Sequence, residues 1–268
     1  MIYYFSGTGN TRAVADAISK KIGEEVKLIT IVDSMSEKPE GKSIGLVFPV
    51  YSWGVPPLFL YFLQSMPEQF WENVKKSKIR VWAVLTCGDE VALTPEMLQK
   101  ELEKHSIRAE AIWSIIMPNN YVLLPGFDVD SKEIENEKLR RMNERINFIS
   151  SRISSDWMGT DVVRGDFKWI KTKLIYPLFK KWGIFPSKWF STPSCVSCGI
   201  CVKSCPLKNI VLDKNGHPKW SSNCCSCLAC YHSCPHHSIE YGGMTKRKGQ
   251  YLFPVRFRKN NGYKNRPT

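Results

Sequence analysis

The chain has 268 residues and a formal net charge of +13, and its hydrophobic content of 43% is enough for a packed core. This length indicates two domains, and because no apolar run reaches about 18 residues, the sequence predicts no transmembrane helix. Residues 1–6 hold neither a basic region nor a long apolar core, so we expect no secretory signal and a cytoplasmic location.

The positive charge is confined to the second half of the chain. Residues 1–160 carry 19 Lys and Arg against 21 Asp and Glu, whereas residues 161–268 carry 19 against four. A positive domain attracts acidic partners and speeds their encounter. Nucleic acid is the other common partner of a basic region, but the sequence holds no nucleic-acid-binding motif, so we expect none.

The N-terminus predicts a strand, a polar turn and a helix. The apolar run Ile2–Phe5 is followed by the string Ser6-Gly7-Thr8-Gly9-Asn10-Thr11 and then by Val14, Ala17, Ile18 and Ile22 at helical spacing. Small residues let backbone N–H groups surround an anion, and the hydroxyls and the helix N-terminus add donors. We therefore predict a phosphate-binding loop at residues 6–11, with a glycine-rich turn that binds no ligand as the alternative.

The composition of this loop favours one kind of phosphate. Arg12 follows Thr11 where a nucleoside-triphosphate loop would end in Gly-Lys-Ser or Gly-Lys-Thr, and it also replaces the third glycine of a dinucleotide fingerprint. A loop rich in hydroxyls and without a lysine suits a phosphomonoester held by hydrogen bonds. No second nucleotide fingerprint is present, so we expect no NAD(P)H site.

Alternating strands and helices continue to about residue 158. Further strands are predicted at Val26–Val32, Ser43–Val50, Ile79–Thr86 and Ala109–Met117, with helices at Pro95–His105, capped by Thr94, and Ile134–Ile153. The last helix, which starts from Asp130 or Ser131, is expected to face the sheet with Ile134, Leu139, Met142, Ile146 and Ile149. This alternation predicts an α/β domain over residues 1–158, with a doubly wound five-stranded parallel sheet in the order 2-1-3-4-5.

Two basic segments flank the remaining part of the chain. Residues 163–190 hold eight aromatic residues and seven basic ones, and we read 159–192 as a linker. Such a segment either packs its aromatic rings between two domains or lies on an anionic membrane surface. The tail, 244–268, has eight Lys and Arg and no acid, and is predicted to wrap back as an arm, partly as a strand at Tyr251–Phe257.

Eight of the ten cysteines form two copies of one pattern within residues 193–243. The copies are Cys195-x2-Cys198-x2-Cys201-x3-Cys205-Pro and Cys224-x2-Cys227-x2-Cys230-x3-Cys234-Pro, offset by 29 residues. This spacing is that of the bacterial ferredoxin run, in which the fourth cysteine ligates the other cluster. We therefore expect one [4Fe–4S] cluster on Cys195, Cys198, Cys201 and Cys234, and the second on Cys224, Cys227, Cys230 and Cys205.

Structural zinc is the competing interpretation of these cysteines. Four-cysteine zinc sites normally use two C-x2-C pairs separated by a longer loop, whereas here three cysteines follow one another at x2 intervals, twice. Cys225 is surplus to the repeat, and only Cys224 preserves the spacing. We treat Cys225 as a non-ligand packed beside the cluster.

Both halves together resemble the family of flavodoxin–ferredoxin fusion proteins. The string Ser6-Gly7-Thr8-Gly9-Asn10-Thr11 is similar to the FMN phosphate loop of flavodoxins, and the cysteine runs are similar to those of small α+β ferredoxin domains. The resemblance covers the whole chain and implies FMN and two [4Fe–4S] clusters as cofactors. The basic cluster half departs from free flavodoxins and ferredoxins, which are typically acidic, and this indicates different partners.

The resemblance also implies where the flavin ring would lie. Flavodoxins bind FMN with loops at the carboxyl ends of the strands, and here these loops follow the first, third, fourth and fifth predicted strands. Tyr51 or Trp53 would stack on the ring. The other implied contacts are Pro49 and Gly54 in the aromatic loop, Thr86, Cys87, Gly88 and Asp89 at the opposite edge, and Asn119, Asn120 and Tyr121 on the rim.

These features predict an electron-transfer protein that passes electrons between two [4Fe–4S] clusters, FMN and a redox partner. The expected partner is an acidic redox protein such as a ferredoxin, a flavodoxin or a reductase. The alternative is an FMN-dependent reductase of a small molecule fed by its own clusters, and redox sensing is a third possibility. Exposed clusters would be sensitive to oxygen, which indicates an anaerobic setting.

Overall fold

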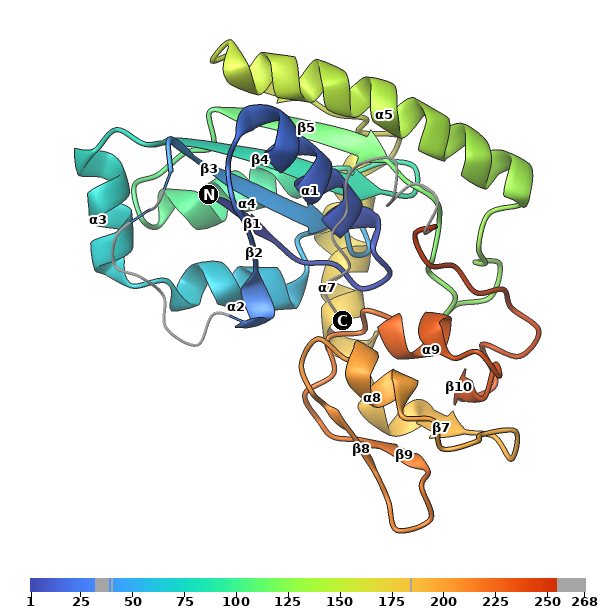
Figure 1. The fold of residues 1–268 in the computed structure, drawn as a ribbon. Helices are drawn as coiled ribbons and strands as arrows, with labels where there is room; N and C mark the ends of the chain where they lie inside the picture. Colours follow the sequence, from blue (N-terminus) through green and yellow to red (C-terminus); the bar gives the residue numbers. More distant parts are fainter. Residues whose placement is uncertain (32–38, 40, 184, 255–268) are drawn as a thin grey trace.

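The computed structural model describes residues 1–31, 39, 41–183 and 185–254, and its centre is a six-stranded parallel sheet (Figure 1). The strands are β1 (Ile2–Tyr4), β2 (Val26–Leu28), β3 (Ser43–Pro49), β4 (Arg80–Cys87), β5 (Ala111–Ile116) and β6 (Gly159–Asp161). Their order is β2-β1-β3-β4-β5-β6, and every pair is parallel. Continuous apolar strands of this kind are buried on both faces. No helix in the described part of the chain is long and apolar enough to span a membrane.

Helices cover both faces of this sheet. On one face, α1 (Asn10–Ile22) and α5 (Lys132–Ser154) bury apolar side chains against the strands. On the other face lie α2 (Pro57–Ser65), α3 (Glu68–Lys76) and α4 (Thr94–Glu103). The result is a three-layer α/β architecture in which the loops after β1, β3, β4 and β5 share one edge of the sheet, where ligands of such folds bind.

Several elements differ from the sequence predictions. The sheet has six strands rather than five, and β2 ends at Leu28, where a 3-10 turn, Ile29–Ile31, replaces the predicted continuation to Val32, a residue outside the described ranges. Thr94 begins α4 and donates to the Val91 carbonyl, so it does not cap the helix from outside. On α5 the Ser131 hydroxyl accepts from the Ile134 N–H as the N-cap, and the side chain of Ile134 is 49% exposed instead of facing the sheet.

The sixth strand comes from the segment predicted as a linker, and Arg145 on α5 fastens it. The guanidinium group donates to the Asp161 carboxylate at 2.8 Å, to the Asp161 carbonyl at 2.8 Å and to the Ser114 carbonyl at 3.1 Å. These bonds join α5, β5 and β6. A three-residue strand has too few apolar contacts to predict from its sequence, and it is held here by one side chain.

The rest of the basic segment forms a bent helix that lies between the sheet and the cysteine-rich part (Figure 1). It consists of α6 (Lys168–Ile170), η2 (Lys171–Ile175), which is one turn of π-helix, and α7 (Tyr176–Trp182), followed by the 3-10 turn η3 (Pro186–Lys188). One side is packed, because Thr172 and Tyr176 are buried and the Tyr176 hydroxyl donates to the Val55 carbonyl. The other side exposes Ile170, Leu174 and Leu178.

The cysteine-rich unit, residues 189–241, is built from two matching halves. Its elements are β7 (Trp189–Ser191), α8 (Ile200–Ser204), β8 (Ile210–Leu212), β9 (Pro218–Trp220), α9 (Ala229–Ser233) and β10 (Ile239–Tyr241). Each of β9, α9 and β10 lies 29 residues after β7, α8 and β8, which extends the cysteine repeat to the whole unit. β7 pairs antiparallel with β10, and β8 pairs antiparallel with β9.

We expect Arg145→Ala to destabilise the protein by about 1–3 kcal/mol, because it removes three hydrogen bonds and leaves their acceptors at the edge of β5 and β6. Urea unfolding of the two forms measures the difference. The matched control is Arg141→Ala, four residues earlier on α5, whose side chain contacts only the exposed Glu137 and should change stability little. Equal effects of both substitutions would contradict this role of Arg145.

Candidate functional site

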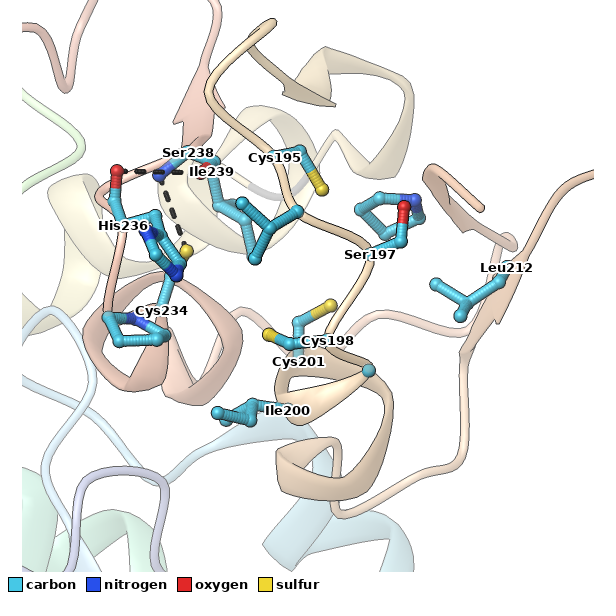
Figure 2. Close-up of a pocket in the computed structure, with 14 residues that line it drawn as sticks. Cys195, Ser197, Cys198, Ile200, Cys201, Leu212, Cys234, His236, Ser238 and Ile239 are labelled. Atoms are coloured by element: carbon cyan, nitrogen blue, oxygen red, sulfur yellow. Dashed lines mark hydrogen bonds between the residues drawn. The ribbon is translucent and has the colours of Figure 1, made fainter. Parts of the chain in front are cut away.

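Two hollows in the cysteine-rich unit are each lined by four of the repeated cysteines. The first, of about 340 Å³, lies among Cys195, Cys198, Cys201 and Cys234 (Figure 2). The second, of about 330 Å³, lies among Cys205, Cys224, Cys227 and Cys230, with Cys225 also on its wall. In each hollow three cysteines come from one run and the fourth from the other, which is the grouping that the spacing predicts.

The backbone repeats as closely as the cysteines do. Ser197 and Ser226 have φ of 56° and 54°, and the residues before the two short helices, Gly199 and Leu228, have φ of 70° and 62°. These left-handed residues turn each run around its hollow, and only one of the last pair is a glycine. The Ser233 hydroxyl donates to the Ser204 hydroxyl at 3.0 Å, so equivalent residues of the two halves meet.

Backbone N–H groups point at the sulfur atoms of both hollows. Cys205 Sγ accepts from Asn209 N at 3.3 Å, and Cys234 Sγ accepts from Ser238 N, its repeat equivalent, at 3.3 Å. Cys224 Sγ accepts from Ser226 N at 3.4 Å. Such donors stabilise sulfur that carries negative charge. The arrangement therefore suits thiolates bound to a cationic centre.

The thiols of these hollows stay protonated unless such a centre is present. Burial raises the pKa of Cys224 to about 11, raises that of Cys230 further, and raises that of Cys201 in the first hollow. Ligation requires deprotonation, so the hollows need a group whose charge offsets the cost of four buried thiolates. Within the described residues no three His, Cys, Asp or Glu side chains converge on a point that would hold one metal ion. The four cysteines of each hollow instead surround a larger space, and the donor set and this space fit an iron–sulfur cluster.

The predicted phosphate loop lies at the sheet edge where β1 passes into α1. Gly9, with φ of 99°, is the N-cap of α1 and provides no side-chain cap, so the first N–H groups of the helix have no partner within it. Thr8 Oγ1 accepts from Asn120 Nδ2 at 2.6 Å, which leaves its own hydrogen free to donate to an anion. Thr11 Oγ1 lies 2.7 Å from Thr86 Oγ1, so hydroxyls from two predicted loops meet.

Two residues of this loop mainly support the structure. Ser6 Oγ accepts from the Gly9 N–H at 3.2 Å and shapes the turn. The Asn10 amide donates to the Pro118 carbonyl at 3.0 Å, and its oxygen accepts from the Tyr251 hydroxyl at 2.6 Å. Asn10 therefore ties the loop to β5 and to the tail, and its side chain is engaged within the protein.

In the aromatic loop after β3, the two rings have separate environments. Ser52 and Trp53 have φ of 46° and 60° and close a tight turn in which Tyr51 and Gly54 bond to each other. The Trp53 indole donates to Glu90 at 2.8 Å, and its carbonyl accepts from Thr172 at 2.9 Å. Trp53 is thereby held against the bent helix, whereas Tyr51 packs edge-on against Phe5 and Phe179.

The loops after β4 and β5 lie side by side. Cys87 points its sulfur toward the Ile115 carbonyl, and burial raises its pKa to about 12, so its side chain is inert and only its backbone faces the loop edge. A Cβ on Gly88 would overlap the Asn119 amide. Asn119 is bonded to Asp130, and Asp89 pairs with Lys138 at 3.5 Å.

The second hollow adjoins the phosphate loop directly. A Cβ on Gly7 would overlap the carbonyl oxygen of Cys227, so only glycine allows this approach. Cys225 and Cys227 also pack against the apolar cluster beneath the sheet, to which Phe5 and Tyr51 belong. The first hollow lies on the other half of the repeat, and its Cys198 is exposed. The two hollows thus form an outer site and an inner one that touches the α/β domain.

His232 and the tail fasten this junction, and neither role is visible in the sequence pattern. His232 Nε2 donates to the Asn120 carbonyl at 2.7 Å, and its Nδ1 accepts from the Tyr251 N–H at 3.0 Å. Burial lowers the pKa of His232 to about 4, so the ring is neutral and both nitrogens are used. Phe253 N donates to the Thr8 carbonyl at 2.9 Å. Residues 251–254 form no strand, and 255–257 of the predicted strand lie outside the described ranges.

No family model and no curated protein matches this chain. The assignment of the site therefore rests on its own residues: two sets of four cysteines, a phosphate loop without a side-chain cap, and the glycine contact that joins them.

We expect Gly7→Ala to loosen the junction, because its methyl group would displace Cys227, and to destabilise the protein by about 1–3 kcal/mol. Hydrogen exchange should become faster at the amides of Tyr251 and Phe253, which cross the junction. Gly243→Ala is the matched control, since nothing lies within 4 Å of its Cβ position. Unchanged exchange in Gly7→Ala would show that the close approach is not required.

Proposed function

We propose that the protein is an electron carrier that joins one FMN to two [4Fe–4S] clusters in a single chain. The observation that carries this proposal is the contact of Gly7 in the phosphate loop with Cys227 on the wall of the second hollow. It brings a site suited to a flavin phosphate beside a site suited to a cluster. Clusters exchange single electrons and flavin exchanges one or two, so the pair would couple the two kinds of step.

The cysteine-rich unit would serve as a ferredoxin-like domain. Cys195, Cys198, Cys201 and Cys234 would hold the outer cluster, and Cys205, Cys224, Cys227 and Cys230 the inner one. Cys225 packs against the apolar cluster of the α/β domain, and Cys224 accepts the Ser226 N–H at 3.4 Å. This supports Cys224 rather than Cys225 as the ligand.

The residues of the α/β domain would hold FMN by its phosphate. The N–H groups at the start of α1 supply donors and the favourable end of the helix dipole. The Thr8 and Thr11 hydroxyls add donors from within a buried loop, since the two side chains are 2% and 1% exposed. Tyr51, which lies between the phosphate loop strand and the second run of cysteines, is better placed to contact the flavin ring than Trp53, which is bonded to Glu90.

The junction would exclude water from the path between the two cofactors. Tyr51 is buried beside Cys225 and Cys227, and burial strongly raises the pKa of its phenol, so the ring stays neutral. The neutral His232 and the tail residues Tyr251 and Phe253 close the other side. These side chains fix the inner cysteine run against the loop and move no protons.

We further propose an acidic redox protein as partner, because the excess positive charge lies in residues 161–268. Part of the tail has a structural use, since the Lys248 ammonium group donates to the Val122 carbonyl at 2.8 Å and also to that of Leu124. Lys203, Lys208 and Lys214 on the cysteine-rich unit are exposed. They are better placed than Lys248 to guide a partner to the outer site.

Anaerobically purified protein should contain about eight iron atoms and eight acid-labile sulfides per chain, as two four-iron clusters require. Cys201→Ala should lose about half of this iron, because it removes one ligand from the outer set, whereas Cys225→Ala should keep all of it. Elemental analysis with acid-labile sulfide determination measures both. Stoichiometric zinc without iron in the wild-type protein would rule out the clusters.

Heat should release FMN, because the loop provides one phosphate site. Thr8→Val and Thr11→Val should each weaken FMN binding by about 1–3 kcal/mol through the loss of a buried donor. Fluorescence titration of the flavin-free protein measures this, and Thr160→Val on the exposed strand β6 serves as the control. Release of FAD, or wild-type affinity in both loop variants, would contradict the assignment.

A further inference from the structure

The two halves of the cysteine-rich unit share a backbone but differ in two pairs of side chains that matter for the hollows. Trp189 on β7 corresponds to Pro218 on β9, and Ser191 corresponds to Trp220. Both tryptophans line the second hollow, and neither lines the first. Their rings stack with centroids 6.1 Å apart and planes tilted by 22°. The inner site thus has an aromatic wall that its repeat partner lacks.

The indole N–H of Trp220 is a buried donor without an acceptor. Its nitrogen is enclosed, and no atom of the described residues meets it with the geometry of a hydrogen bond. It lies beside the Cys230 sulfur, where it opposes the rise in the pKa of that thiol that burial causes. Buried donors are almost always satisfied in native proteins. An unsatisfied one on the wall of a cysteine-lined hollow indicates an acceptor within the hollow.

Trp189 makes a similar approach from the neighbouring strand. Its indole N–H lies beside Cys224, where it offsets part of the rise in pKa that burial gives this thiol. The ring is fixed by an edge-on contact with Tyr241, whose centroid is 4.8 Å away, and by the stacked Trp220. Both indoles are therefore held in place by neighbouring rings, with their N–H groups toward the second set of sulfurs.

The first hollow has no such donors. The position of Trp189 is taken by Pro218, which has no N–H, and the Ser191 hydroxyl is bonded to His217 Nδ1 at 3.1 Å. Its wall is formed by aliphatic residues such as Leu212 and Ile239, and Cys198 is exposed to solvent. Water, rather than a fixed donor, would meet the sulfurs of the outer site.

This difference acts on reduction potential. A reduced cluster carries one more negative charge than an oxidised one, so donors aimed at its sulfurs favour reduction, while burial opposes it. The inner site is the more buried of the two, and burial alone would make it the harder to reduce. Two indole donors, added to the backbone donors on Cys205 and Cys224, oppose that effect with charge-assisted hydrogen bonds.

We propose that the Trp189 and Trp220 indoles donate to sulfur atoms of the inner cluster and place its reduction potential above that of the outer one, an inference that rests on the proposed function. Each electron that arrives at the exposed site then moves inward, so the outer cluster is oxidised, the inner one is reduced, and no proton or atom is transferred. The tryptophans act as positioning residues that set the direction of flow toward the phosphate loop.

The test is a redox titration of anaerobic protein, followed by the EPR signals of the two reduced clusters. The variants are Trp189→Phe and Trp220→Phe, which keep an aromatic ring and remove the N–H. We expect each to shift the higher midpoint downward by roughly a tenfold change in the one-electron equilibrium, which is 59 mV, and to leave the lower midpoint in place. The control is Trp169→Phe, since Trp169 is 62% exposed on the bent helix.

The outcomes separate this inference from the proposed function. Eight irons with unchanged midpoints in both variants, or equal shifts of both midpoints, would overturn the role of the tryptophans and leave the clusters intact. A wild-type protein without iron would overturn both. If a variant does not accumulate, wild-type protein with 15N-indole tryptophan replaces it: hyperfine coupling on the signal that appears first on reduction supports the proposal, and coupling on the later signal or on neither contradicts it.

Discussion

The architecture depends on one close contact, in which the backbone of the second cysteine run lies against Gly7. A side chain at this position would overlap the Cys227 carbonyl, so the approach is possible only because the phosphate loop is built from small residues. The same glycine-rich composition serves two purposes. It frees N–H groups at the start of α1 for an anion, and it lets a second domain approach within contact distance of that anion's site.

Contacts on both sides of this approach make it specific. The neutral His232 connects the Asn120 carbonyl to the Tyr251 N–H, and the tail then reaches Asn10 and Thr8. Residues near positions 8, 120, 232 and 251 therefore meet at one place. The bent helix fixes the opposite side through Thr172 and Tyr176. Rigid positioning of this kind is what electron transfer between bound groups requires, because it keeps the two sites close and water out.

Local patterns made much of this predictable from the sequence. The strands of the central sheet are continuous apolar runs, and the cysteine spacing and its 29-residue offset follow from the geometry of one repeated backbone. The offset also extends to β7, β8, β9 and β10, which a reading confined to the cysteines does not reveal. The three-residue strand β6 was missed because Arg145, distant in sequence, holds it in place.

Contacts between distant residues were beyond sequence reasoning. Nothing in the pattern indicates that Trp53 bonds to Glu90, that Ile134 faces solvent, or that His232 reaches Asn120 across 112 positions. The difference between the two hollows is of the same kind. The cysteine repeat predicts two equivalent sites, and only the placement of Trp189 and Trp220 on one wall shows that they differ.

The central claim is that the inner cysteine site and the phosphate loop form one continuous path for electrons. Rapid photochemical reduction of the anaerobic protein, followed at the flavin and cluster absorption bands, tests it most directly. The account predicts that electrons delivered to the clusters reach the flavin at a first-order rate independent of protein concentration. A rate that rises in proportion to protein concentration, or a flavin that stays oxidised while the clusters are reduced, would contradict it.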